Sequence, residues 1–170
     1  IVRNYDVDGI HFDDYFYPYK IAGLEFPDSA SFRQYGAAKY SLENKDDWRR
    51  SNVDTVIMML GKTIRDTKPW VQFGISPFAV WRNQDKDPLG SATKAGQTNY
   101  DDLYADILKW MRERWIDYVV PQLYFPRGFG LVDYGIMLDW WALHSYGRHV
   151  YVGQGVYRLG NQTPPQWKDP

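Results

Sequence analysis

Residues 46–76 read DDWRRSNVDTVIMMLGKTIRDTKPWVQFGIS, and this stretch carries a helix pattern followed by a strand pattern. Apolar side chains recur at helical spacing over 53–64, two aspartates stand at the front, and a proline lies just beyond the end. The pattern predicts an amphipathic helix over 46–67. The mostly apolar run over 70–76 then predicts a strand.

Outside this stretch, the same two patterns alternate along the chain. Strand-type runs occur at 7–13, 117–124 and 149–154, and helical patterns occur at 99–115 and 133–146. We expect Asn99 to cap the second predicted helix and Gly147 to end the third. The order strand, helix, strand, helix, strand, helix, strand is typical of parallel βαβ units.

Composition limits the classes of protein to which the chain can belong. Its 170 residues predict one domain over 1–170 and exclude a complete eight-stranded (β/α) barrel, which needs roughly 200–250 residues. Aromatic residues make up 18%, so the chain has ample material for a core. A net charge of −1 offers no field for a polyanion, and no apolar run reaches the roughly 18 residues of a membrane span. We therefore expect neither a nucleic-acid partner nor a membrane span.

Polar side chains gather on one face of the predicted sheet, near the carboxyl ends of the strands. Side chains alternate between the two faces of a strand, and parallel α/β sheets place their ligand sites at the carboxyl ends. The side chains expected at this edge are Asp13, Ser76, Gln122, Tyr124 and Gln154.

Two carboxylates end the first predicted strand, Asp13 and Asp14, and an aromatic loop follows them. Carboxylates surrounded by aromatic rings suit glycoside hydrolysis, in which one group acts as acid and another as base or nucleophile. In a regular strand the two would face opposite ways, so Asp13, on the face of His11, is the first choice for the catalytic residue. Asp14 could instead bind sugar hydroxyls, hold the loop, or replace Asp13 if a bulge shifts the register.

Two long loops follow the first two predicted strands, at 14–45 and 77–98. Loops of this length in a compact domain are usually functional or disordered. We therefore expect Tyr15 in the first loop, and Trp81 and Arg82 in the second, to contact a ligand.

Several common chemistries have no support in the sequence. The chain has no cysteine, and its three histidines lack metal-ligand spacing, so we expect no metal site and no cofactor. A divalent cation held by Asp13 and Asp14 is left open. Serine-hydrolase elbows, P-loops and dinucleotide fingerprints are also missing.

Five motifs occur in order along the chain, at 7–18, 48–53, 68–78, 100–106 and 117–124. Together they resemble the glycosyl hydrolase-like family 10, a group of bacterial envelope-associated (β/α)₈ proteins. The resemblance implies a TIM-barrel glycosidase in an extracytoplasmic location, with some relatives acting on bacterial cell-wall glycan strands. It also implies that this chain is a partial barrel, covering about strands 4–7.

Carried over by position, either Asp13 or Asp14 would be the catalytic carboxylate at the end of the fourth barrel strand. Gln122 and Tyr124 would line the site from the sixth strand. A second carboxylate is not evident at another strand end. It would be Asp14, a residue on the missing strands, or an N-acetyl group of the substrate acting as nucleophile.

The sequence therefore favours a retaining or inverting glycoside hydrolase that acts on a bacterial polysaccharide. Two alternatives stay open, a non-catalytic carbohydrate-binding barrel and a metal-dependent carbohydrate esterase using Asp13, Asp14 and a histidine. Because four strands leave open sheet edges, we also expect either the remainder of the barrel or a partner chain to cover them.

Overall fold

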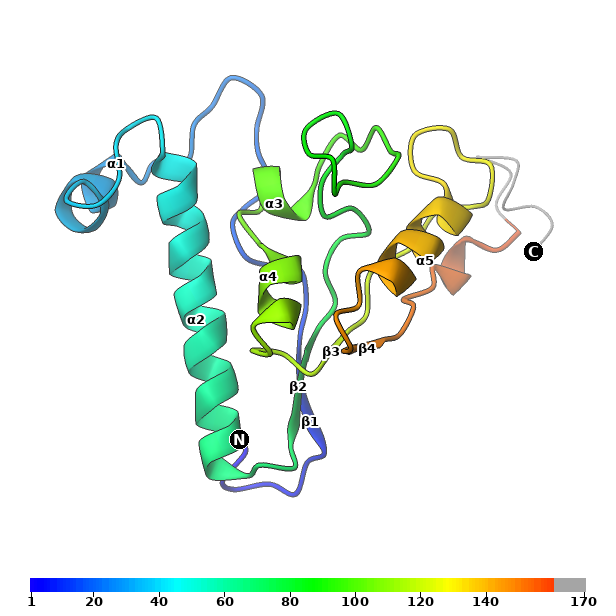
Figure 1. The fold of residues 1–170 in the computed structure, drawn as a ribbon, viewed down its shortest axis with the longest axis horizontal. Coiled ribbons are helices and arrows are strands. Elements are labelled where there is room, and N and C mark those ends of the chain that lie inside the picture. The colour runs from blue at the N-terminus through cyan, green and yellow to red at the C-terminus, as the bar shows by residue number, and fades with distance from the viewer. Residues whose placement is uncertain (161–170) are drawn as a thin grey trace.

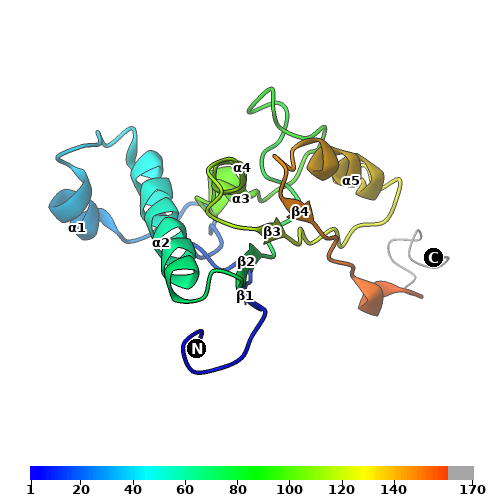
Figure 2. The same cartoon turned by 60° about the horizontal axis from the view of Figure 1, so that its bottom comes forward.

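The computed structural model describes residues 1–160 and joins four parallel strands into one sheet, with helices packed on one of its faces (Figure 1, Figure 2). The strands are β1 Gly9–Phe12, β2 Gln72–Ile75, β3 Tyr118–Val119 and β4 His149–Val150. They lie side by side in chain order, and each pairs in parallel with the next. The predicted mixed α/β class with parallel strands is confirmed.

Regular pairing is shorter than the sequence patterns predict, particularly in β3. Pro77 and Pro121 carry no N–H, so the ladder cannot continue unbroken beyond Val119. Isolated parallel bridges then join Gln122 to Phe78 on one side and to Gly153 on the other. These bridges hold the strand ends in line where the candidate site forms.

Helix α2, Lys45–Thr67, confirms the long helix predicted over 46–67. Asp46 and Asp47 lie in its first turn, where carboxylates interact favourably with the helix dipole. Ile57 and Ile64 are buried against the rest of the core, and α2 contacts β2. The helix thus packs on the apolar face of the sheet at β2 (Figure 1).

The continuous helix predicted over 99–115 is wrong, because the structure divides this segment into α3, Asn99–Asp102, and α4, Ile107–Arg112. Tyr104, between them, has φ +54°, which an α-helix does not allow. Each short helix has its own cap, since the Thr98 side chain accepts from Asp101 N and the Asp106 side chain accepts from Lys109 N. Each short helix therefore begins at an N-cap of its own.

Asn99 is not the cap that its sequence position predicts. Its side chain is fully buried, accepts a hydrogen bond from Phe78 N, and donates to the carbonyls of Phe78 and Val80. A buried amide satisfies its donors and acceptor in this way. Asn99 therefore fixes the start of the loop over 77–98, and the hydroxyl of Thr98 takes the capping role.

Helix α5, Tyr134–Leu143, begins after Asp133, whose side chain accepts from Ile136 N. It ends three residues earlier than the predicted 133–146, and His144 occupies the C-cap. Gly147 has φ +73°, but it lies in the turn that leads to β4 and does not end the helix. No helix within residues 1–160 is both long and apolar enough to cross a membrane.

The long loop over 14–45 is partly helical. It contains a short α-helix, α1 Ser29–Ser31, and a π-helical turn, η1 Phe32–Gly36. Past β4, a 3₁₀ turn, η2, spans Val156–Arg158. The loop over 14–45 is held on α2 by the side chains of Lys45 and Arg49, both of which pair with buried Asp28.

The two faces of the sheet differ in character. Phe73, Ile75 and Val119 are buried and belong to the core beneath the helices. On the other face, His11 is exposed and the Tyr118 ring lies over Gly74, where an added Cβ would be 2.1 Å from that ring. One face is therefore covered by helices and the other is open within residues 1–160. This arrangement is compatible with a segment of a (β/α) barrel.

Candidate active site

The carboxyl ends of the first three strands meet at an open pocket of about 610 Å³. Its lining residues come from β1, β2 and β3 or follow them directly. They are His11, Asp13, Asp14, Tyr15, Tyr19, Ser76, Gln122 and Tyr124. All except Tyr19 were expected from the sequence, so the structure brings most of the predicted site residues together.

Both aspartates line this pocket, although the alternation of a regular strand predicts that only one would. The reason is that β1 ends at Phe12, so the alternation does not extend to the aspartates. Asp14 is 4% exposed, whereas Asp13 is exposed. The backbone N–H of Asp14 donates to Asp13 Oδ1 over 2.9 Å, which fixes the two residues relative to each other.

The surroundings of Asp14 raise the pKa of its carboxyl group to about 6. Burial is the main cause, and the negative charge of Asp13 and a hydrogen bond between the two carboxyl groups add to it. Burial removes the water that would stabilise the ionised form. A carboxyl group that keeps its proton up to about pH 6 can donate it to a leaving oxygen.

Gln122 connects the ends of three strands through its side-chain amide. Its Nε2 atom donates to Asp13 Oδ1 and to the Ser76 carbonyl, both over 3.0 Å. The Ser76 hydroxyl donates to the Val120 carbonyl and so ties β2 to β3. Asp13 is thus oriented by two N–H donors, one from Gln122 and one from its neighbour.

The predicted site residue His11 lies against the ring of Tyr118, which the sequence did not assign to the site. His11 Nδ1 lies 3.1 Å from the Tyr118 hydroxyl, and the two rings stack with centroids 5.7 Å apart. Tyr118 fits there because Gly74, opposite it in β2, has no side chain. A glycine inside a strand is a sequence signal for such a close approach.

Aromatic rings form the rim of the pocket. The Tyr15 ring is 80% exposed and that of Tyr19 is 50% exposed. Tyr19 was missed, although it belongs to the same aromatic segment as Tyr15. Burial, followed by the charge of Asp13, raises the pKa of the Tyr124 hydroxyl, which shows that this ring lies near the carboxylates.

Three of the expected ligand contacts lie outside this pocket. Trp81 is a core residue, 5% exposed, because its indole N–H donates to Asp106 and its ring stacks on Trp140. Arg82 pairs with Asp101 over 2.8 Å and with Asp87 over 3.1 Å, which holds its own loop.

Gln154 is the third of these residues. Its side-chain amide donates to the Tyr134 hydroxyl over 2.7 Å, at the start of α5. The last predicted strand ends at Val150 as a regular strand, so alternation does not determine where Gln154 points. The structure therefore places Gln154 on the α5 side of the fold.

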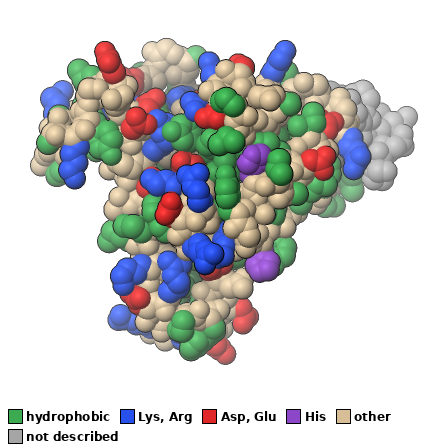
Figure 3. Space-filling model, in the orientation of Figure 1, with side chains coloured by type: hydrophobic (Ala, Val, Ile, Leu, Met, Phe, Trp, Pro, Cys, Tyr) green, Lys and Arg blue, Asp and Glu red, His purple; other side chains and the backbone are tan. Residues whose placement is uncertain are grey.

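Charged side chains of both signs are spread over the surface of residues 1–160. Figure 3 shows basic and acidic side chains interspersed over one face of the molecule, in keeping with the net charge of −1. Within residues 1–160, no three His, Asp or Glu side chains come together in a way that could hold a metal ion.

Comparisons with known proteins place the chain in a family. The family model described as glycosyl hydrolase-like 10 matches residues 1–169. The chain is 52% identical to glycosyl hydrolase YngK of Bacillus subtilis (strain 168), over 100% of the chain and 33% of that protein. It is 39% identical to glycosyl hydrolase DigH of Escherichia coli (strain K12), over 98% of the chain and 38% of that protein. The chain spans about a third of the length of these relatives. It belongs to the glycosyl hydrolase-like 10 family.

Proposed function

We propose that this chain supplies the acid–base carboxyl groups of a glycoside hydrolase that cleaves O-glycosidic bonds in a bacterial polysaccharide such as cell-wall glycan strands. We further propose that its sheet forms about strands 4–7 of a (β/α)₈ barrel in an extracytoplasmic protein. Family membership supports the hydrolase class. The observation that carries the proposal is the buried carboxyl group of Asp14, with a pKa of about 6, in an open pocket with an aromatic rim.

The proposal gives Asp14 the role of proton donor to the glycosidic oxygen. Its burial suits this role better than the exposed position of Asp13, which was the first choice from the sequence. Asp13 and Asp14 are consecutive residues, and Asp13 Oδ1 already accepts from the backbone N–H of Asp14 and from Gln122 Nε2.

Asp13 therefore fits an orienting role beside the reacting centre. Its Oδ1 atom is held by Gln122, so the other oxygen of its carboxylate can position a hydroxyl, an amide or a water molecule of the substrate complex. The nucleophile would then be an N-acetyl group of the substrate, a water molecule, or a carboxylate on another part of the protein.

The test is an Asp14→Asn variant of the full-length protein. Loss of general acid catalysis predicts a fall of about 10²–10⁴-fold in glycan cleavage, measured as new reducing ends, with a melting temperature equal to or above that of the wild type. The matched control is Asp85→Asn, an exposed aspartate outside the pocket, which should cleave normally. Undiminished turnover by Asp14→Asn would remove Asp14 from the mechanism.

A second candidate function is carbohydrate binding without cleavage. It is favoured by the exposed rings of Tyr15 and Tyr19, which offer faces on which sugar rings can stack. Calorimetry with oligosaccharides separates the two functions when it is combined with a long incubation for reducing ends. Binding with no new reducing ends would support the second.

A further inference from the structure

A second pocket, of about 440 Å³, lies beside the candidate active site, between the loop over 14–45 and the start of α2. Its walls include Tyr17, Tyr19, Phe26, Tyr104, Glu25 and Asp46. We propose that this tyrosine pocket binds an uncharged sugar unit of the same glycan chain whose cleavage is proposed above. This inference rests on the proposed function, which identifies the ligand as a glycan. The tyrosine pocket supplies the evidence for a second binding position on that glycan.

The tyrosine pocket adjoins the carboxylate pocket at Tyr19. Tyr19 lines both of them, and a further hollow between them is lined by residues 15–19 alone. The Tyr19 ring packs on Phe78, at a centroid distance of 5.5 Å. Burial, followed by the charge of Asp14, raises the pKa of the Tyr19 hydroxyl, so this side chain lies within reach of the carboxylates. A glycan bound at one pocket can therefore extend along the aromatic segment into the other.

The aromatic walls are held rigidly before any ligand binds. The Tyr17 ring meets Phe26 edge to face at 5.3 Å and Tyr104 at 4.9 Å. Phe26 is 40% exposed, so part of its ring is available to a ligand. The C–H faces of a sugar ring are apolar, and rigid aromatic rings provide contact area at a low cost in conformational entropy.

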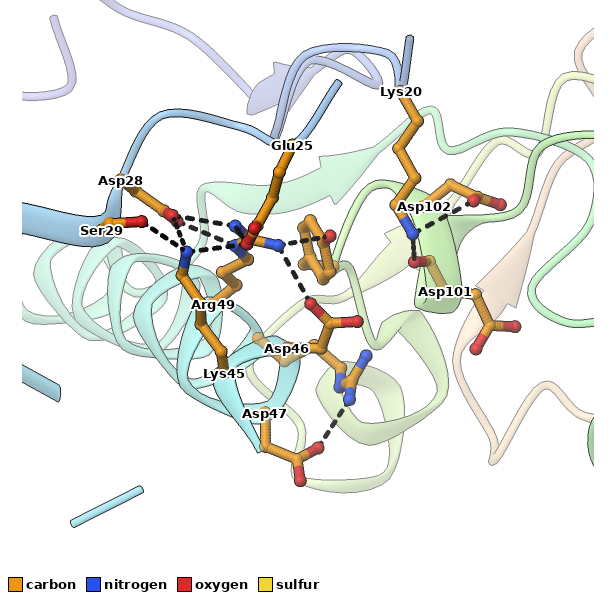
Figure 4. A network of polar contacts seen from close by, with 12 residues as sticks. Lys20, Glu25, Asp28, Ser29, Lys45, Asp46, Asp47, Arg49, Asp101 and Asp102 are labelled. Atoms are coloured by element: carbon orange, nitrogen blue, oxygen red, sulfur yellow. Dashed lines mark hydrogen bonds and ion pairs between the residues drawn. The ribbon is translucent and has the colours of Figure 1, made fainter. Parts of the chain in front are cut away.

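Two carboxylates on the pocket wall, Glu25 and Asp46, are held in place by Arg49, whose guanidinium N–H groups are all used in hydrogen bonds (Figure 4). Arg49 donates to the Tyr104 hydroxyl and to three carboxylates, those of Glu25, Asp28 and Asp46. Among the described residues, only one oxygen each of Glu25 and Asp46 takes part in these bonds. Their side chains are 66% and 50% exposed, so the second oxygens can accept hydrogen bonds from sugar hydroxyls.

The charges of this network argue against an anionic ligand. Lys45 and Arg49 carry two positive charges, and the three carboxylates that pair with them carry three negative charges. Lys20, the other cation on the pocket wall, already pairs with Asp102 over 3.4 Å. A carboxylated sugar would meet like charge here, whereas a neutral sugar would meet acceptors for its hydroxyl groups.

The experiment measures how affinity depends on the length of a neutral glycan. The full-length protein carrying Asp14→Asn is titrated in a calorimeter with β-1,4-linked oligomers of N-acetylglucosamine and of glucose, from two to six units. We expect affinity to rise with length. Phe26→Ala should reduce the gain in affinity between the two-unit and the six-unit oligomer about tenfold. This corresponds to a loss of about 1.4 kcal/mol of binding free energy. Tyr35→Ala, an exposed aromatic in η1 outside the pocket, is the matched control and should leave the rise unchanged.

A second variant keeps the test valid if Phe26→Ala does not fold. Leu24 is 66% exposed and lines the pocket, so Leu24→Trp should narrow it without disturbing the core and should also reduce the rise. Melting temperatures show whether each variant is folded. The proposal is overturned if folded Phe26→Ala and Leu24→Trp keep the full rise, if no neutral oligomer binds, or if oligogalacturonates bind as tightly as the neutral oligomers.

These experiments distinguish a failure of the hydrolase proposal from a failure of the tyrosine-pocket proposal. Length-dependent binding that needs Phe26, in a protein that cleaves none of these oligomers with Asp14 intact, would support the tyrosine pocket and contradict the hydrolase. Cleavage that requires Asp14 but is indifferent to Phe26 and Leu24 would support the hydrolase and contradict the tyrosine pocket.

Discussion

The burial of Asp14 links the proposed acid catalysis to the stability of the fold. Its pKa of about 6 in the folded protein lies above the value of about 3.9 expected in an unfolded chain. The folded state therefore binds this proton more tightly than the unfolded state does. The resulting stabilisation is fully present below about pH 4 and is lost as the pH rises through about 6.

The first prediction is that Asp14→Asn stabilises the protein at neutral pH, because the variant buries no charge. Its free energy of unfolding should exceed that of the wild type at pH 8, and the difference should shrink towards pH 4. Urea unfolding across this range measures the difference. Asp85→Asn, at an exposed position, should show no such trend. If the wild type became more stable relative to Asp14→Asn as the pH rises from 4 to 6, the raised pKa of Asp14 would be contradicted.

Asp28 shows the opposite behaviour at another buried carboxylate. Hydrogen bonds from Arg49, and then from Lys45, hold its pKa at about 2 despite its burial. Its contribution to stability is therefore present above about pH 4 and is lost as the pH falls towards 2.

The second prediction is that Asp28→Asn destabilises the protein by about 3 kcal/mol at pH 7, because two buried cations lose a negative partner. The matched control is Asp66→Asn. Asp66 pairs with Lys62 on the surface of α2, where the side chains are 61% and 73% exposed, and the control should cost less than about 0.5 kcal/mol. Chemical denaturation measures both. Equal effects of the two substitutions would show that the network does not hold the loop on α2.

At the scale of elements, packing overrides local propensity in α2. Gly61 lies inside this 23-residue helix, where alanine would normally be favoured by about 1 kcal/mol. A Cβ at this position would lie 2.3 Å from the Trp115 carbonyl oxygen. The glycine therefore allows α2 to approach the segment that follows α4.

The third prediction is that Gly61→Ala destabilises the protein by about 1–3 kcal/mol, although it improves helix propensity. Val56→Ala is the control, because Val56 lies on the same helix and is 54% exposed; it should be neutral or slightly stabilising. Thermal unfolding compares the two. If Gly61→Ala melted at a higher temperature than the wild type, α2 would not approach the segment after α4 this closely.

At the scale of the whole molecule, the sheet leaves one side of each outer strand without a partner strand within residues 1–160. Strands β1 and β4 are the outer strands of the sheet in residues 1–160. Beside β1 lies an apolar hollow of about 590 Å³, whose lining includes Val2, Ile10 and Leu60. Exposed strand edges and apolar surface of this kind promote association with other chains.

The fourth prediction is that the 170-residue chain expressed alone associates at micromolar concentration, which sedimentation velocity would detect. His149→Lys should weaken this association, because a charged side chain on edge strand β4 opposes strand pairing and His149 is already exposed. A chain that stays monomeric at every concentration would contradict the expectation that these edges need cover.

The sequence by itself determined the kinds of elements, their order and the edge of the sheet where the site lies. These features depend on local periodicity and on the rule that parallel strands end at one edge, so they do not require distant contacts. The helix over 46–67 and the grouping of Asp13, Ser76 and Gln122 follow from such patterns.

Only the tertiary structure decided which carboxyl group is buried, where the second predicted helix breaks and which aromatic residues reach the site. Asp14 has a raised pKa because its carboxyl group is buried beside the charge of Asp13, just after regular strand pairing stops at Phe12. Tyr104 adopts a positive φ while its hydroxyl bonds Arg49 from a distant helix. Trp81 is placed in the core by Trp140 and Asp106. Each outcome depends on side chains from segments far apart in the chain, and sequence periodicity carries no information about those contacts.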